Sequence, residues 1–466
     1  MSRINTNVSS LISQRVLRGN NQQLNTSLER LSTGLKINSG KDNPAGLIAS
    51  ENLRAEKTGL TAAIDNAERA SNIIGTAEGG LNEVSSLLNE LQSLVSSTAN
   101  SGGLSAEEKQ ANQLQVDSIL GTINRIAAST SFQGKKLLNG SLDYTTSGVT
   151  STAIDNLKVN ASRLADGATG SVVVQVVASA TTAKVGYTGG AVAGGTATIE
   201  VAGNAGTEQL SFASGTNASA VVASVNVVKA ATGVSATLSG ADIRFESTQF
   251  GSAQFVSVSA IAGTFSIATP KDTGTDAQVT VNGAAAQTEG KTVSYRNSNL
   301  DVEFDLDATF NTPGTTTFGV TGGGATFALG SKVTETDKAS IGISSVSTGS
   351  LGDGYSGFLS SLGSGGANSL TGDNLVTSQK VIDKAIKQVS QIRGRLGAFQ
   401  KFTIGSTINS LGVAYENASA AESAIRDTDF AEETSKLTRS QILSQAASTV
   451  LSQANAAPQA ALSLLR

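Results

Sequence analysis

Apolar residues recur every seven positions along residues 45–98 and define one face of a single long helix. One row repeats in steps of seven and a second row interleaves with it: Leu53, Leu60, Ala67, Ile74, Leu81, Leu88 and Val95, with Ala63, Ala70, Ala77, Val84 and Leu91. Steps of three and four place both rows on the same face. At 1.5 Å per residue this helix would be roughly 80 Å long. It therefore needs other long helices beside it.

A second apolar stripe near the carboxyl end supplies such a partner. It shifts by one residue after its first part and then continues: Ile382, Ala385, Val389, Ile392, Leu396 and Phe399, followed by Ile404, Ile408, Leu411, Tyr415 and Ala418. We predict one long helix across both parts, although each of its glycines weakens it by roughly 1 kcal/mol relative to alanine.

The amino-terminal segment predicts a shorter helix that ends near Lys36. Its apolar rows are formed by leucines at heptad spacing: Leu17, Leu24, Leu28, Leu31 and Leu35. Pro44 suits the first position of the long helix and Asn43 suits its cap. Residues 36–43 are therefore predicted to form a connector.

Two further helices are predicted. One covers about residues 105–128 and begins with a capping box formed by Ser105 and Glu108. The other is a final amphipathic helix over residues 430–455, which Pro458 is expected to end. The apolar positions of this last helix are Leu437, Ile442, Ala446, Val450 and Leu451.

The middle of the chain has a different composition from the ends. Residues 141–370 are rich in Gly, Thr, Ser, Ala and Val, and alternating runs at 292–295 and 302–306 predict short strands. We therefore predict an α+β multi-domain fold. Its long terminal helices form a coiled coil or helical bundle, and its central insertion is all-β-rich.

Charge and hydropathy exclude two classes of partner. The formal net charge is −4, without the clustered Lys and Arg that phosphate binding needs, so nucleic acid is not expected as a partner. Residues 440–465 contain no charge but are interrupted by Ser, Gln and Asn. A membrane span would need about 20 mostly apolar residues, so no membrane insertion is expected.

The chain contains no Cys and no His. This excludes disulfides, thiolate nucleophiles, Cys/His zinc sites and Ser-His-Asp catalysis. We expect no enzyme activity, no catalytic residue, no metal site and no cofactor. The amino terminus lacks the apolar segment of a secretory signal, so export would follow a route without signal-peptide cleavage.

Three separate groups of residues resemble the bacterial flagellins. The first is Arg-Leu-Ser-Thr-Gly-Leu-Lys-Ile-Asn-Ser at 30–39 with Asp-Asn-Pro-Ala-Gly at 42–46. The second is Ile-Asn-Arg-Ile-Ala at 123–127 with Phe-Gln-Gly-Lys-Lys-Leu-Leu-Asn-Gly at 132–140. The third lies at the carboxyl end, at residues 423–433, 439–443, 453–455, 458–459 and 464–466. Three motifs in the right order are far more specific than one short pattern.

This resemblance implies a subunit that polymerises into the extracellular flagellar filament. It also implies three layers: an inner coiled coil of 1–43 with 427–466, a helical bundle of 44–178 with 365–426 that carries a β-hairpin after Gly140, and a variable outer part at 179–364 with a hook-IN-like motif at about 207–261. The partners that it implies are other copies of the chain, an export chaperone, hook-associated proteins and a filament cap, with type III export.

Lone amphipathic ends have no place to bury their apolar stripes, so we expect them to pack on neighbouring copies. The expected polymerisation seams are Leu17, Leu24, Leu28, Leu31, Leu35, Leu53, Leu60, Ile74, Leu81, Leu88, Val95, Leu437, Ile442, Ala446, Val450 and Leu451. A heptad stripe taken alone is more often internal core. Two other functions stay open: a hook–filament junction protein, or an adhesin or enzyme carried by the insertion.

Some flagellins are detected by a Toll-like innate receptor through an arginine-rich pattern on the long helix. The corresponding stretch here includes Asn89, Glu90 and Leu94, lacks both arginines and reverses one charge. Receptor recognition is therefore expected to be weak.

Overall fold

The computed structural model divides the chain into two compact units. The terminal unit contains Met1–Ala67, Leu329–Asp337 and Ser406–Arg466, and the central unit contains Glu68–Ala328 and Lys338–Gly405. The structure describes residues 6–100, 103–163, 169–189, 192, 195–265, 267, 269–297, 299–354, 356–372 and 375–463, with side chains up to 456.

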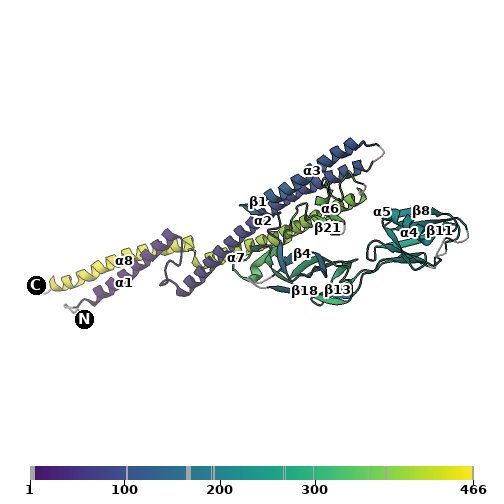
Figure 1. Cartoon of the computed structure of the whole chain (residues 1–466). Helices are drawn as coiled ribbons and strands as arrows, with labels where there is room; N and C mark the ends of the chain where they lie inside the picture. The colour runs from purple at the N-terminus through teal and green to yellow at the C-terminus, as the bar shows by residue number, and fades with distance from the viewer. Residues whose placement is uncertain are drawn as a thin grey trace. The chain divides into compact units, whose positions relative to one another are not determined.

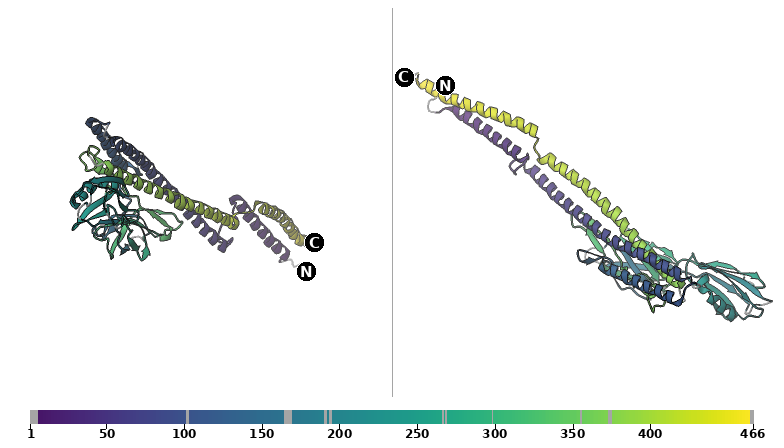
Figure 2. Two further views of the ribbon diagram at one scale, coloured as in Figure 1. Left: turned by 90° about the vertical axis from the view of Figure 1, so that its right-hand side faces the viewer. Right: turned by 90° about the horizontal axis from the view of Figure 1, so that it is seen from above.

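Two helices from opposite ends of the chain pair in the terminal unit. They are α1 (Val8–Thr33) and α8 (Phe430–Ser463), and they lie side by side in Figures 1 and 2. Helix α1 ends at Gly34, whose φ of 72° suits glycine and whose N–H donates to the Arg30 carbonyl at 2.8 Å.

The long predicted helix is present as α2 (Pro44–Thr98), which runs from the terminal unit into the central unit. Asn43 caps it as predicted, because its Oδ1 accepts a hydrogen bond from the Gly46 N–H at 3.0 Å. Within the terminal unit, the first part of α2 pairs with α7 (Ser406–Arg426).

The prediction that Pro458 ends the last helix is wrong, because α8 continues to Ser463. A proline inside a helix removes one N–H donor and so leaves the carbonyl four residues earlier without its helical partner. That carbonyl belongs to Ala454, and it accepts a hydrogen bond from the Asn7 side chain at 2.7 Å instead.

The helical part of the central unit contains the rest of α2 together with α3 (Ala106–Ser129) and α6 (Leu375–Ala398). The predicted capping box of Ser105 and Glu108 is present at the start of α3. The side chain of Gln92 on α2 donates to Asp383 on α6 at 3.3 Å, and Asn112 on α3 donates to Thr98 on α2 at 3.0 Å.

A π-helical segment, η3 (Phe399–Gly405), lies between α6 and α7 at the point where the apolar stripe shifts by one residue. A π-helix bonds residue i to i+5 rather than i+4, so it accommodates one extra residue per turn. The predicted long helix is thus formed by α6, η3 and α7, and Ile404 is buried after the shift.

A two-sheet sandwich forms the first part of the insertion. Its five-stranded sheet has the order β14-β13-β5-β18-β3 and its four-stranded sheet the order β15-β16-β17-β4. The two sheets share one apolar core, in which Phe304 faces Val293 across one sheet and Phe318 faces Val172 across the other. The strands are β3 (Tyr144–Ser147), β4 (Ile154–Ser162), β5 (Gly170–Ala178), β13 (Gln278–Val281), β14 (Ala284–Ala285), β15 (Gln287–Glu289), β16 (Thr292–Arg296), β17 (Leu300–Leu306) and β18 (Gly314–Gly323).

A second β-rich module is inserted between β5 and β13 and has its own core. Its sheets have the orders β6-β10-β9 and β12-β11-β7-β8. In its core the rings of Tyr187 and Phe265 are stacked, with 3.9 Å between their centroids. A short helix, α4, lies between β8 and β9 of this module. The elements are β6 (Lys184–Tyr187), β7 (Ala197–Gly203), β8 (Gly206–Phe212), α4 (Ala218–Val227), α5 (Lys229–Thr232), β9 (Val234–Ser239), β10 (Asp242–Ser247), β11 (Phe255–Ala262) and β12 (Lys271–Thr273).

Small elements complete the fold. The hairpin β1 (Ser131–Phe132) and β2 (Lys135–Lys136) comes directly after α3, so the expected hairpin lies before Gly140 and not after it. The chain after Gly140 instead enters β3, which pairs with β18 of the sandwich. The others are β19 (Ala325–Ala328), η1 (Glu335–Asp337), β20 (Lys338–Ile341), β21 (Gly352–Asp353), β22 (Gly357–Phe358) and η2 (Leu359–Leu362).

The burial of α2 in the central unit leads to a stability prediction. Leu81 is fully buried, so Leu81→Ala should lower the free energy of unfolding by about 2–5 kcal/mol in urea titrations followed by circular dichroism. Leu114 on α3 is 65% exposed, so Leu114→Ala should change it by less than about 0.5 kcal/mol. Equal effects of the two substitutions would contradict this packing.

Candidate assembly surface

The face by which α1 contacts α8 is formed mainly by small and polar residues. On α1 the buried residues are Ser10, Ser13 and Ser27, and on α8 they are Glu433, Ser440 and Ala447. Both sets follow the spacing of a heptad seam. Only partly buried leucines join them, namely Leu17, Leu24 and Leu31 on α1 with Leu437 and Leu451 on α8.

Hydrogen bonds along this seam define an antiparallel register. Ser10 Oγ donates to Asn455 Oδ1 at 2.7 Å, and Asn20 Nδ2 donates to the Leu443 carbonyl at 3.1 Å. Farther along, Ser27 Oγ donates to Glu433 Oε1 at 2.7 Å. A hydrogen bond of this kind adds only about 0.5–1.5 kcal/mol net. These hydrogen bonds therefore fix the register of the pairing, while the half-buried leucines supply its apolar contacts.

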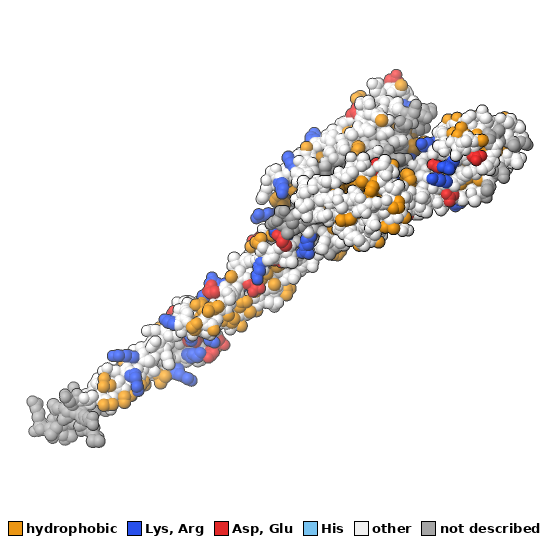
Figure 3. Space-filling model, turned by 60° about the horizontal axis from the view of Figure 1, so that its bottom comes forward, with side chains coloured by type: hydrophobic (Ala, Val, Ile, Leu, Met, Phe, Trp, Pro, Cys, Tyr) orange, Lys and Arg blue, Asp and Glu red, His pale blue; other side chains and the backbone are white. Residues whose placement is uncertain are grey.

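Large apolar side chains lie on the outward faces of the same two helices. Leu11 is 57% exposed, Ile442 is 64% exposed and Val450 is 57% exposed. We define the outer stripes as Val8, Leu11, Ile12 and Val16 on α1 with Ile442, Leu443, Ala446 and Val450 on α8. Figure 3 shows orange hydrophobic side chains along the visible face of this helix pair. Exposed apolar stripes of this kind mark interaction sites.

The structure separates the sequence-predicted seam residues into three groups. Ile442, Ala446 and Val450 lie on the outer stripe of α8 and Leu28 is exposed elsewhere on α1, whereas Leu17, Leu24, Leu31, Leu35, Leu53, Leu437 and Leu451 are half-buried. The third group is buried within one chain, at 4% exposure or less: Leu60, Ile74, Leu81, Leu88 and Val95.

That third group corrects the expectation drawn from the heptad pattern. Their side chains are covered by neighbours of the same chain, so no apolar surface is left for a second copy. Heptad spacing identifies a buried face but cannot tell which molecule covers it. In contrast, the prediction omitted Val8, Leu11, Ile12 and Val16, although steps of three residues from 8 to 11 and of four residues from 8 to 12 and from 12 to 16 already define a stripe beside the leucine row.

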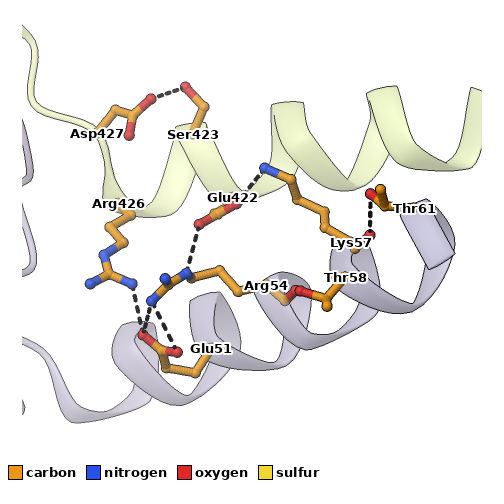
Figure 4. Close-up of polar contacts among 9 residues, drawn as sticks. All are labelled: Glu51, Arg54, Lys57, Thr58, Thr61, Glu422, Ser423, Arg426 and Asp427. Atoms are coloured by element: carbon orange, nitrogen blue, oxygen red, sulfur yellow. Dashed lines mark hydrogen bonds and ion pairs between the residues drawn. The ribbon is translucent and has the colours of Figure 1, made fainter.

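A charged network joins α2 to α7 in the terminal unit (Figure 4). Lys57 Nζ lies 2.8 Å from Glu422 Oε2, and Arg54 Nε lies 3.8 Å from Glu422 Oε1. Glu51 Oε1 accepts from Arg426 Nη1 at 2.7 Å and from Arg54 Nη1 at 3.0 Å. Five side chains of alternating charge thus connect two segments that are more than 360 residues apart in the chain.

The backbone continues this pairing into the connectors. The Lys36 N–H donates to the Arg426 carbonyl at 2.6 Å, and the Thr428 N–H donates to the Gly34 carbonyl at 2.9 Å. Leu35 and Asp427 therefore form an isolated antiparallel bridge. The helix pair α1–α8 and the helix pair α2–α7 are joined through these two connectors.

The charged network shifts two pKa values. The hydrogen bond from Arg426, and then that from Arg54, lowers the pKa of Glu51 below its ordinary value. The hydrogen bond to Glu422 raises the pKa of Lys57. In each case the charged form is favoured, because the partner carries the opposite charge.

Two family models match the helical ends of the chain. The bacterial flagellin N-terminal helical region matches residues 4–143, and the bacterial flagellin C-terminal helical region matches residues 379–465. Flagellin D of Vibrio cholerae is 32% identical over 471 residues, which cover 99% of each chain. The chain belongs to the bacterial flagellins. Polar flagellin B/D of Vibrio parahaemolyticus is equally similar, with 32% identity and 99% coverage of both chains.

Membership of this family makes the protein a structural subunit of the extracellular flagellar filament. Nothing in the comparisons favours the alternative functions. Among solved structures, FliC from Burkholderia pseudomallei is 15% identical, covers 71% of this chain and 99% of its own, and has a TM-score of 0.24, which is too low to carry weight. No helix in the described part of this flagellin is long and apolar enough to cross a membrane.

The charged network predicts a pH dependence for the stability of this flagellin. Because the pKa of Glu51 is lowered in the folded chain, its stabilising contribution is present above the ordinary value of 4.5 and is lost as the pH falls through the lowered value. The contribution of Lys57 is present below 10.5 and is lost as the pH rises through its raised value.

Glu51→Gln should therefore lower the midpoint temperature of helix unfolding by a constant amount above about pH 5, and by progressively less in acid, as measured by circular dichroism. Glu56, an exposed neighbour on α2, provides the matched control, and Glu56→Gln should leave the midpoint unchanged. A Glu51→Gln difference that persists unchanged at about pH 2 would contradict this account.

Proposed function

We propose that copies of this flagellin join through the outer stripes of α1 and α8. The observation that carries the proposal is that large apolar side chains of both helices stay exposed on the outward faces, while the seam already uses serines, a glutamate and half-buried leucines. Transferring each Leu, Ile or Val of a stripe from water into a neighbour contributes about 1.5–3 kcal/mol. Several such residues per copy offset the cost of ordering the chain ends.

A second copy of the same helix pair is the partner that suits this surface. The carboxyl-terminal part of α8 carries no charge from Ser440 onward, so the α8 stripes of two copies can meet without burying an ion. A contact between different faces of identical subunits does not have to close into a ring and then generates a helical filament. This geometry agrees with the family's role as a filament subunit.

The layered organisation stays part of the proposal. We assign residues 1–43 with 427–466 to the filament interior, 44–178 with 365–426 to the surrounding bundle, and 179–364 to the outer surface, with the hook-IN-like motif at about 207–261. The separate core of the inserted module, which lies wholly within 179–364, supports an outer part that folds independently of the terminal helices.

The partners beyond the chain itself are proposed from the family resemblance alone. They are an export chaperone for the carboxyl-terminal helix, hook-associated proteins and a filament cap. Export by the type III route would need no cleaved signal peptide. The exposed stripe of α8 is the surface on which a chaperone would prevent premature assembly.

Removing the outer stripe of α8 should abolish growth without unfolding the subunit. Ile442→Ser combined with Val450→Ser should raise the critical concentration for growth on filament seeds by at least about tenfold, because two apolar side chains lose their burial. Light scattering and electron microscopy measure the growth. Deletion of residues 440–466 should leave a soluble monomer.

The matched control replaces two polar residues of the same helix, Gln441→Ser and Gln445→Ser, and should grow as the wild type does. Both residues are exposed but lie outside the defined stripe. Normal filaments from the truncated chain, or equal growth of the two double variants, would refute the proposed surface.

Recognition by a Toll-like innate receptor should be weak. Asn89 and Glu90 are exposed on α2, Leu94 is half-buried, and no Lys or Arg occurs between Arg69 and Lys109. An arginine-dependent receptor contact therefore has no donor on this part of the helix. A reporter-cell response as strong as that to an enteric flagellin would contradict the prediction.

A further inference from the structure

Asn7 forms two hydrogen bonds with the two different atoms of its side-chain amide. Its Oδ1 accepts from the Ser10 N–H at 3.0 Å and so caps the first turn of α1. Its Nδ2 donates to the Ala454 carbonyl of α8 at 2.7 Å. One side chain thus starts the first helix of the chain and binds the last one.

The carbonyl that Asn7 binds has no donor within its own helix. In an α-helix the carbonyl of residue i accepts from the N–H of residue i+4. The residue four positions after Ala454 is Pro458, which has no N–H, yet α8 continues through it to Ser463. A backbone acceptor left unpaired beside a neighbouring helix is costly, and the Asn7 amide satisfies it.

A second asparagine on α1 provides an internal contrast. Asn20 Nδ2 donates to the Leu443 carbonyl at 3.1 Å. That carbonyl has the N–H of Ala447 available as its helical donor, because residue 447 is not proline and lies inside α8. The Asn20 bond is therefore additional, whereas the Asn7 bond replaces a missing one.

We propose that Asn7 and Pro458 form a lock that positions the outer stripes of α1 and α8 for assembly. This proposal rests on the proposed function of those stripes. Val8, Leu11 and Ile12 directly follow Asn7, and Val450 lies one helical turn before Ala454. Fixing Asn7 on Ala454 sets the two stripes in one register, so that a neighbouring copy meets a single preformed surface. Asn7 is a positioning residue in this scheme.

Two substitutions separate the lock from simple helix capping. Aspartate and serine both cap helices about as well as asparagine, but neither can donate across to α8 in the same way. Asn7→Asp and Asn7→Ser should each raise the critical concentration for seeded growth on the order of 2- to 10-fold, the effect of one hydrogen bond. The neutral serine shows that the effect does not come from added charge. Asn20→Ser should change growth by less than about twofold.

The decisive experiment supplies the backbone N–H that the Ala454 carbonyl lacks in the wild type. Pro458→Ala restores an N–H to which the Ala454 carbonyl can bond within α8. In this background Asn7→Ser should cost less than about twofold, so the two substitutions are not additive. A residue that acts only as a cap would give the same loss in both backgrounds. Hydrogen exchange at the amides of Ser10 and Ser13 should follow the same pattern, which keeps the test valid if a single variant fails to grow.

Wild-type growth of Asn7→Ser, or an equal loss with proline and with alanine at position 458, would overturn the lock. These outcomes differ from failure of the proposed function. If the wild-type flagellin itself does not grow on seeds, the assembly surface is wrong. If the wild type grows and Asn7 has no effect, only the lock is wrong.

Discussion

The main physical constraint on this flagellin is the apolar surface of its terminal helices that no residue of its own chain covers. Pairing α1 with α8 satisfies serines, asparagines and a glutamate, but it leaves valine, leucine and isoleucine side chains in water on the outward faces. Hydrogen bonds with small net energies fix how the helices align, whereas the larger hydrophobic contribution of the outward faces is not realised within the single chain. The hydrogen bonds that align the two helices and the apolar side chains that stay exposed thus lie on different faces of these helices.

Helix α2 has the same heptad spacing as the terminal helices, but most of its apolar residues are buried within the chain. From Leu60 onward its apolar rows are covered inside one chain, and alanines at positions 63, 67, 70 and 77 leave room for helices to approach closely. The partner stripe on α6 must shift by one residue to continue into α7, and the π-helical segment at Phe399–Gly405 provides that shift without ending the helix. A charged network also joins α2 to α7.

The second β-rich module is inserted into the sandwich without interrupting the sandwich sheet. Strands β5 and β13 are neighbours in the sandwich sheet, although the whole second module lies between them in the chain. Each of the two has a closed apolar core of its own. A module that enters and leaves through adjacent strands can vary without changing the sheet that carries it.

Local patterns in the sequence determined the helices, most of their caps and the family. Asn43, Ser105 and the one-residue shift after Phe399 each act through neighbours a few positions away, so their effects could be predicted before any fold was known. The end of α8 could not be predicted in this way, because the Ala454 carbonyl that lacks the N–H of Pro458 is bound instead by Asn7, 447 residues earlier in the chain. Likewise, heptad spacing identified which residues are apolar on one face, but only the tertiary structure decided which of those faces are covered within the chain. Periodicity depends on the geometry of one helix, whereas burial depends on which distant helix is packed against it.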